Sequence, residues 1–100
     1  MGPRRGVEPD APVAPAPYAG WNELYEDNVT PVYRLMYSRV GNRADAEDLT
    51  SEVFVAALRP LRSDAPRAQV RSYLTATART VLARYWKRTF GVTVTMIDDA

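Results

Sequence analysis

The chain has 100 residues, of which 13 are Lys or Arg and 12 are Asp or Glu, and it contains neither cysteine nor histidine. A chain of this length supports one small domain, and without cysteine it can form no disulfide and no thiolate metal site. Without histidine it also lacks the commonest general base and the commonest metal ligand. No stretch approaches the roughly 20 apolar residues of a membrane span. We therefore expect a cytoplasmic protein without cofactor, metal or membrane insertion.

The nearly balanced total hides an uneven distribution of charge along the chain. Residues 1–58 carry five basic and nine acidic side chains, whereas residues 59–100 carry eight basic and three acidic ones. A polyanion would be attracted to the second half and repelled by the first. Two solvated helix faces of opposite sign would give the same pattern, so the charge distribution leaves both interpretations open.

Residues 1–19 are predicted to form a flexible tail. Residues 1–20 hold five of the eight prolines and three of the five glycines, without apolar periodicity. No uninterrupted apolar run follows Arg4 and Arg5, which argues against a secretory signal. The foldable domain is then residues 20–90, and a domain this small buries only about 60% of its unfolded surface.

The first predicted helix runs from about Gly20 to Arg39. Its apolar face follows a spacing of three and four residues through Trp21, Leu24, Tyr25, Asn28, Val32, Leu35 and Met36. Pro31 should kink this helix or start a new turn, because it removes a backbone donor and clashes with the preceding turn. Gly41 and Asn42 are expected to end it.

The second predicted helix runs from about Ala44 to Arg59, with Asn42 or Asp45 as the cap. Its apolar face consists of Ala46, Leu49, Val53, Phe54, Ala57 and Leu58. Pro60 stops the helix, and two prolines bound a loop at residues 60–66.

The third predicted helix runs from about Arg67 to Arg88. Its buried side consists of Val70, Tyr73, Leu74, Thr77, Ala78, Val81, Leu82 and Tyr85. Residues 92–96 look faintly strand-like but have no partner strand, so residues 91–100 are interpreted as the start of an inter-domain linker. The predicted fold is all-α, a small three- to four-helix bundle.

Acidic side chains gather on one side of the second predicted helix. Asp45, Asp48 and Glu52 fall at positions i, i+3 and i+7, and Glu47 flanks them. Paired carboxylates carry out acid–base chemistry only in a cleft that separates their pKa values, and an exposed helix face provides none. A solvated face and a face that docks on a basic partner both fit this pattern.

The loop and the third predicted helix combine cations with aromatic rings. The residues are Arg59, Arg62, Arg67, Arg71, Tyr73, Arg79, Arg84, Tyr85, Trp86, Lys87, Arg88 and Phe90. Single-stranded nucleic acid needs this mixture, because cations follow the phosphates and rings stack on bases. The cations do not form one stripe, so some of the rings must belong to the core. Tyr73 is either a packing residue or a base platform.

These residues resemble region 2 of the extracytoplasmic-function (ECF) sigma factors, within the sigma-70 family, over residues 24–88. The strongest similarity lies in VGNRADAEDLTSEVF at residues 40–54. Two supporting segments are LYEDNVTPVYRL at residues 24–35 and VRSYLTATARTVLARYWKR at residues 70–88.

The resemblance implies a set of partners and roles. The helix with the AEDL motif would dock on the clamp helices of the largest subunit of core RNA polymerase, through Asp45, Glu47, Asp48, Leu49, Glu52 and Phe54. The specificity loop, Arg59 to Gln69, and the following helix would hold the non-template strand of the promoter −10 element and a flipped base. The implied DNA-binding residues are Arg59, Arg62, Ser63, Asp64, Arg67, Arg71, Tyr73, Arg79, Thr80, Arg84, Lys87 and Arg88. An anti-sigma factor is a further expected partner.

The sequence departs from the family pattern at several points. Tyr73 stands where tryptophan is usual, Thr80 where asparagine is usual, and Arg84 where aspartate is common. These differences bear on the preferred base and not on the class of protein. No counterpart of the family's region 4, a helix-turn-helix domain, follows in these residues. We expect region 4 to be absent from this chain, as a fragment, a truncation or a short member of the family.

The predicted function is that of a sigma factor domain that docks on polymerase and recognises and melts the −10 element. The alternative is a sigma-like interaction module that binds polymerase or an anti-sigma factor without opening promoters. An enzyme would need a pocket with perturbed titratable groups, and the sequence offers no such constellation. We therefore expect a protein that is not an enzyme.

Overall fold

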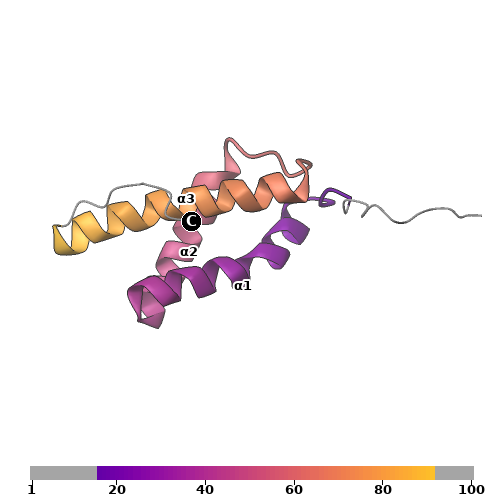
Figure 1. The fold of residues 1–100 in the computed structure, drawn as a ribbon. Coiled ribbons are helices and arrows are strands. Elements are labelled where there is room, and N and C mark those ends of the chain that lie inside the picture. Colours follow the sequence, from indigo (N-terminus) through magenta and orange to yellow (C-terminus); the bar gives the residue numbers. More distant parts are fainter. Residues whose placement is uncertain (1–15, 92–100) are drawn as a thin grey trace, which may run out of the picture.

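A computed structural model of the protein describes residues 16–91, which form three helices and no strand. The helices are α1 (Trp21–Val40), α2 (Arg43–Leu58) and α3 (Arg67–Phe90), and α2 packs against both of the others (Figure 1). The prediction of an all-α fold is confirmed. Most of the predicted tail and all but the first residue of the predicted linker lie outside the described residues.

Helix α1 ends where the sequence predicts. Gly41 has φ 77°, in the left-handed region that favours glycine, and its N–H donates to the Tyr37 carbonyl at 2.9 Å. The helix continues through Pro31 as one element, so Pro31 does not start a new helix.

Helix α2 begins with a side-chain cap. The Asn42 side chain accepts a hydrogen bond from the Asp45 N–H at 2.8 Å, so Asn42 and not Asp45 is the cap. Only Gly41 and Asn42 separate α1 from α2, whereas the non-helical segment 59–66 separates α2 from α3. Helix α3 begins at the predicted residue and extends to Phe90, two residues beyond the predicted end.

The core lies where the three helices meet. Its largest fully buried side chains are Leu24, Met36, Leu49, Val53, Val70, Leu74 and Val81. Burying each such side chain contributes about 1.5–3 kcal/mol, so these contacts hold the three helices in one arrangement. The predicted apolar faces account for all seven.

Several residues depart from the predicted burial, among them Thr50 of α2, which is buried although it lies outside the predicted apolar face. Tyr25 and Leu58, predicted on buried faces, are 47% and 50% exposed because they lie at the outer edge of the α1–α2 contact. Tyr18, Leu61 and Ala65 are buried although they lie outside the helices. Tyr18 belongs to the segment that the sequence assigns to the tail, and the structure packs its ring against the core.

Candidate binding surfaces

The carboxylates of α2 do not form one uniform acidic face. Glu47 pairs with Arg43 at 3.1 Å, and Glu52 pairs with Arg84 of α3 at 3.6 Å. Asp48 is exposed and has no hydrogen bond or ion pair among residues 16–91. Asp48 is therefore the α2 carboxylate that is most available to a partner.

Asp45 links the start of α2 to the second half of α3. The Tyr85 hydroxyl donates to Asp45 Oδ2 at 2.7 Å, and Asn42 Nδ2 donates to the same oxygen at 3.1 Å. The Tyr85 hydrogen bond, then the Asn42 hydrogen bond and the charge of Arg88, lower the pKa of Asp45. The bond to Asp45, with desolvation, raises the pKa of Tyr85. Asp45 thus holds two helices together as well as facing solvent.

Two residues of the predicted docking set belong to the core. Leu49 is 2% exposed and Phe54 is 9% exposed. The Phe54 ring meets the Tyr25 ring edge-on at a centroid distance of 4.9 Å. Leu49 and Phe54 can therefore support a docking surface but offer little surface of their own to a partner.

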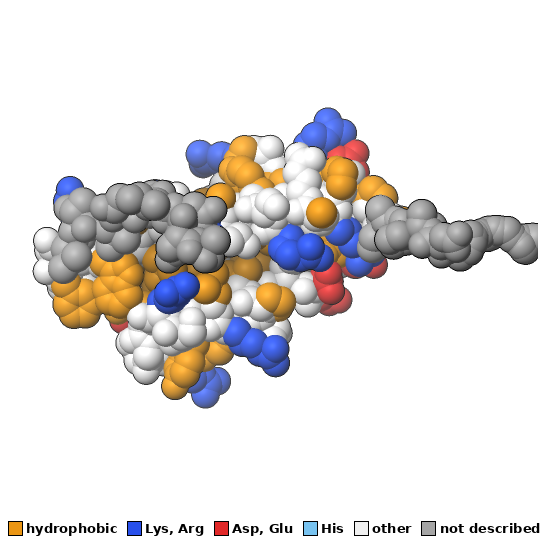
Figure 2. All heavy atoms as spheres, in the orientation of Figure 1, with side chains coloured by type: hydrophobic (Ala, Val, Ile, Leu, Met, Phe, Trp, Pro, Cys, Tyr) orange, Lys and Arg blue, Asp and Glu red, His pale blue; other side chains and the backbone are white. Residues whose placement is uncertain are grey.

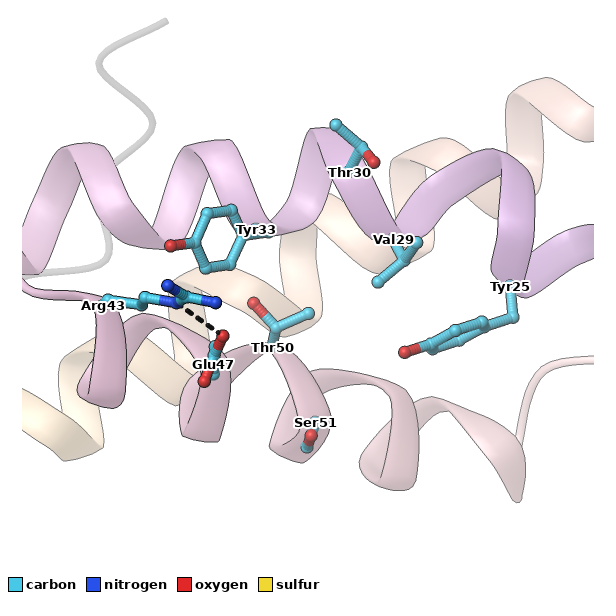
Figure 3. A pocket seen from close by; sticks show the side chains of 8 residues that line it. All are labelled: Tyr25, Val29, Thr30, Tyr33, Arg43, Glu47, Thr50 and Ser51. Atoms are coloured by element: carbon cyan, nitrogen blue, oxygen red, sulfur yellow. Dashed lines mark hydrogen bonds and ion pairs between the residues drawn. The ribbon is translucent and has the colours of Figure 1, made fainter.

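A groove runs between α1 and α2 (Figure 3). Its volume is about 600 Å³, and it is lined by Tyr25, Val29, Thr30, Tyr33, Arg43, Glu47, Thr50 and Ser51. In Figure 3, Arg43 and Glu47 lie at one end beside Tyr33, and Tyr25 lies at the other end. The groove thus combines aromatic walls with one ion pair.

A second hollow, of about 310 Å³, shares Tyr25 and Ser51 with this groove. It extends along the same two helices to Val55 and Leu58, which are 66% and 50% exposed. Sequence reasoning missed this apolar surface because periodicity assigns a residue to a helix face but does not show where the neighbouring helix stops.

The segment between α2 and α3 has buried apolar side chains and exposed charged ones. Leu61 and Ala65 are buried, and Leu61 N–H donates to the Ala57 carbonyl at 3.1 Å. Arg62 donates two hydrogen bonds to Asp64, from Nε at 3.0 Å and from Nη2 at 2.9 Å. These bonds lower the pKa of the Asp64 carboxyl. Ser63, between them, is half-buried.

Arg67, predicted to contact DNA, faces the N-terminal end of the described chain. Its Nε donates to the Ala16 carbonyl at 2.7 Å, and its guanidinium lies 4.2 Å from the centre of the Tyr18 ring. Its side chain is 28% exposed, compared with 80% for Arg62. Arg67 is thus already engaged within the chain.

The remaining predicted DNA residues lie along α3 and at the end of α2. The exposed ones are Arg59, Arg71, Arg79, Thr80, Arg84, Lys87 and Arg88. Figure 2 shows Lys and Arg side chains at separate places on the face drawn, and not in one stripe. Tyr73 is half-buried and packs against the core, which leaves part of its ring accessible.

Metal binding and membrane insertion would each require a recognisable structural feature. Within residues 16–91, no three acidic side chains lie together in a way that could hold a metal ion. None of the helices α1, α2 and α3 is long and apolar enough to cross a membrane.

Comparison with known families agrees with this arrangement. A family model described as Sigma-70 region 2 matches residues 24–89, which include most of α1, all of α2 and nearly all of α3. The chain belongs to the Sigma-70 region 2 family. The predicted family resemblance is therefore confirmed.

Two curated relatives of this Sigma-70 region 2 chain are ECF RNA polymerase sigma factors. SigE of Mycolicibacterium smegmatis is 40% identical over 57 residues, which are 57% of this chain and 22% of SigE. BldN of Streptomyces coelicolor is 38% identical over 68 residues, which are 67% of this chain and 26% of BldN. The chain thus matches a minor part of each relative's length. The comparison with solved structures gave no significant match.

Proposed function

We propose that this chain is the part of a sigma factor that docks on core RNA polymerase and recognises and melts the promoter −10 element. It acts by binding and not by catalysis. The observation that carries the proposal is the family match over residues 24–89, in a chain whose α2 carries carboxylates and whose segment 59–88 carries eight basic residues and one acidic residue. Two surfaces of different charge suit two different partners, one of them a polyanion.

The polymerase-docking surface is proposed on α2 and the adjoining groove. Asp48 supplies an exposed carboxylate, and Asp45, Glu47 and Glu52 lie on the same helix with partners that a docking protein would have to replace. Exposed apolar side chains next to exposed charges are typical of a protein interface. Leu49 and Phe54 support this surface from the core.

The DNA surface is proposed on segment 59–66 and the exposed side of α3. Arg71, Arg84, Lys87 and Arg88 would contact phosphates, while Ser63 and Asp64 would read the flipped base. Cations spread over several faces suit a curved single strand better than a straight duplex groove. Because extracting a base from the stack costs a few kcal/mol, the isolated chain should bind weakly and polymerase should add the remaining affinity.

The deciding experiment measures binding of the chain to a fluorescent single-stranded −10 oligonucleotide with and without core polymerase. Sequence-dependent binding with polymerase supports the proposal. If the chain binds polymerase but no oligonucleotide, it is instead an interaction module for polymerase or an anti-sigma factor. If it binds neither, the proposal fails. A sigma factor role would also place the chain in the cytoplasm.

A further inference from the structure

Residues 16–20, here called the N-terminal strap, are fixed to the fold by Tyr18. The Tyr18 side chain is 5% exposed, although no helix contains it. Its hydroxyl donates to Asp27 and accepts from Asn28 Nδ2 at 3.2 Å, so both partners lie on α1. Asn28 is itself buried and also donates to the Leu24 carbonyl at 2.8 Å. The phenol is therefore held at its polar end as well as by burial of its ring.

Arg67 closes the strap from the opposite side. Its guanidinium stacks over the Tyr18 ring at 4.2 Å and its Nε donates to the Ala16 carbonyl at 2.7 Å. Its Nη2 lies 3.9 Å from Glu23 Oε2, and the other Glu23 oxygen accepts from the Ala19 N–H at 2.6 Å. One arginine thus contacts the strap and the first turn of α1 together.

Arg67 lies at the junction between segment 59–66 and α3, so its contacts link that junction to the strap. It is the first residue of α3 and follows segment 59–66 directly, and Pro66 before it provides no side-chain cap within the described chain. The other end of the segment is fixed by the Leu61–Ala57 hydrogen bond and by burial of Leu61. At the end that leads into α3, burial of Ala65 is joined by the contacts of Arg67 to the strap and to Glu23 of α1.

We propose that Tyr18 and Arg67 are positioning residues that hold segment 59–66 in the geometry needed to read a promoter base. This inference rests on the proposed function, because it is in that function that the segment contacts DNA. In this role Arg67 binds the strap and not a phosphate. Lysine cannot substitute for it, because an ammonium group has neither the planar face that stacks on a ring nor the guanidinium's fixed donor geometry.

The test uses the full chain with core polymerase and a single-stranded −10 oligonucleotide library. Arg67→Lys and Arg67→Ala should both broaden the base preference and leave the salt dependence of binding unchanged. Exchange of the Ala65 and Val70 amides, which donate to the Arg62 and Pro66 carbonyls on either side of Arg67, should rise roughly tenfold in both, because the guanidinium that stacks on the ring and donates to the strap is gone. Arg62→Lys, at an exposed arginine of the same segment, is the matched control and should leave exchange of the Val70 amide unchanged.

Tyr18 provides an independent arm of the test. Because Tyr18 and Arg67 share the contact between ring and guanidinium, the exchange effects of Tyr18→Ala and Arg67→Ala should be less than additive in the double variant. If Tyr18→Ala does not fold, Arg67→Lys decides the matter, since it alters an arginine that is partly exposed. Wild-type exchange in Arg67→Lys would overturn the proposal.

The DNA arm also distinguishes positioning from direct contact. If Arg67→Lys binds like the wild type while Arg67→Ala loses about one unit of salt slope, Arg67 contacts a phosphate and the proposal is wrong. If the wild type itself binds no oligonucleotide with polymerase, the proposed function fails, and the part of the inference that concerns base reading fails with it. Hydrogen exchange in the free chain then still decides whether Tyr18 and Arg67 hold the segment.

Discussion

At the scale of single residues, the contact between Asp45 and Tyr85 predicts how one carboxyl titrates. Tyr85→Phe removes the main cause that lowers the pKa of Asp45, so this pKa should rise towards its ordinary value. The measurement is an NMR titration of the Asp45 carboxyl carbon. Tyr37→Phe, at a half-exposed ring on α1, is the control and should leave the Asp45 titration in place.

The same contact gives a pH dependence of stability with a definite sign. The folded pKa of Asp45 lies below its unfolded value, so the contact stabilises the fold at pH values above the unfolded carboxyl pKa of about 4. The stabilisation is lost as the pH falls through the lower folded pKa. The free energies of unfolding of the wild type and Tyr85→Phe should therefore become more similar as the pH falls. A difference between them that grows in acid would contradict this role of Tyr85.

At the scale of elements, the start of α2 depends on one capping side chain. Asn42→Ala leaves the Asp45 N–H without its acceptor and should lower the free energy of unfolding by about 1 kcal/mol. In a domain of this size that corresponds to a fall in melting temperature of roughly 4–8 °C. Asn42→Ser keeps a capping oxygen and should remain close to the wild type. Equal melting of all three proteins would show that the cap contributes nothing.

Helix α2 also separates a docking role from a structural one. Asp48→Lys reverses an exposed charge without an ion pair among the described residues, so it should slow association with core polymerase and change its salt dependence. Its melting temperature should not change, because exposed charges contribute little to stability. Glu26→Lys makes the same charge change at an exposed position of α1 and is the control. Equal association rates for both variants would rule out docking through Asp48.

At the scale of the whole molecule, the uneven charge predicts which variants weaken DNA binding uniformly. Arg88→Ala should lower binding to all −10 sequences alike and reduce the salt slope by about 0.7–0.9 for each phosphate that it no longer neutralises. Arg39→Ala, at an exposed arginine of α1, should have no such effect. Ser63→Ala should instead alter which base is preferred. If Arg88→Ala changed the base preference and Ser63→Ala did not, Arg88 would be the residue that reads the base and Ser63 would not.

Sequence patterns predicted the helices of this molecule better than the contacts between them. Periodicity and caps identified the three helices to within two residues, because glycine at a left-handed position and proline at a helix boundary act locally. Tyr18 could not be found in this way, since a single buried ring in a proline-rich segment has no period. The exposure of Tyr25 and Leu58 depends on where a neighbouring helix ends, which no local pattern records.

The candidate site shows the same division. The sequence placed carboxylates on α2 and cations on the segment and helix that follow. It did not show that Glu52 pairs with Arg84, that Asp45 accepts from Tyr85, or that Arg67 faces Tyr18. These contacts join residues distant in sequence, and charge type alone does not reveal which distant partner a side chain reaches.

The turn formed by Gly41 and Asn42 also bears on the order in which the chain folds. Because this turn is short, α1 and α2 can pair at a small cost in loop-closure entropy, as in other helical proteins that fold in microseconds to milliseconds. The Ala16–Arg67 contact joins residues 51 positions apart and should form after the transition state. Arg67→Ala should therefore accelerate unfolding in stopped-flow experiments and leave the refolding rate nearly unchanged. Slower refolding of this variant would show that the strap closes early.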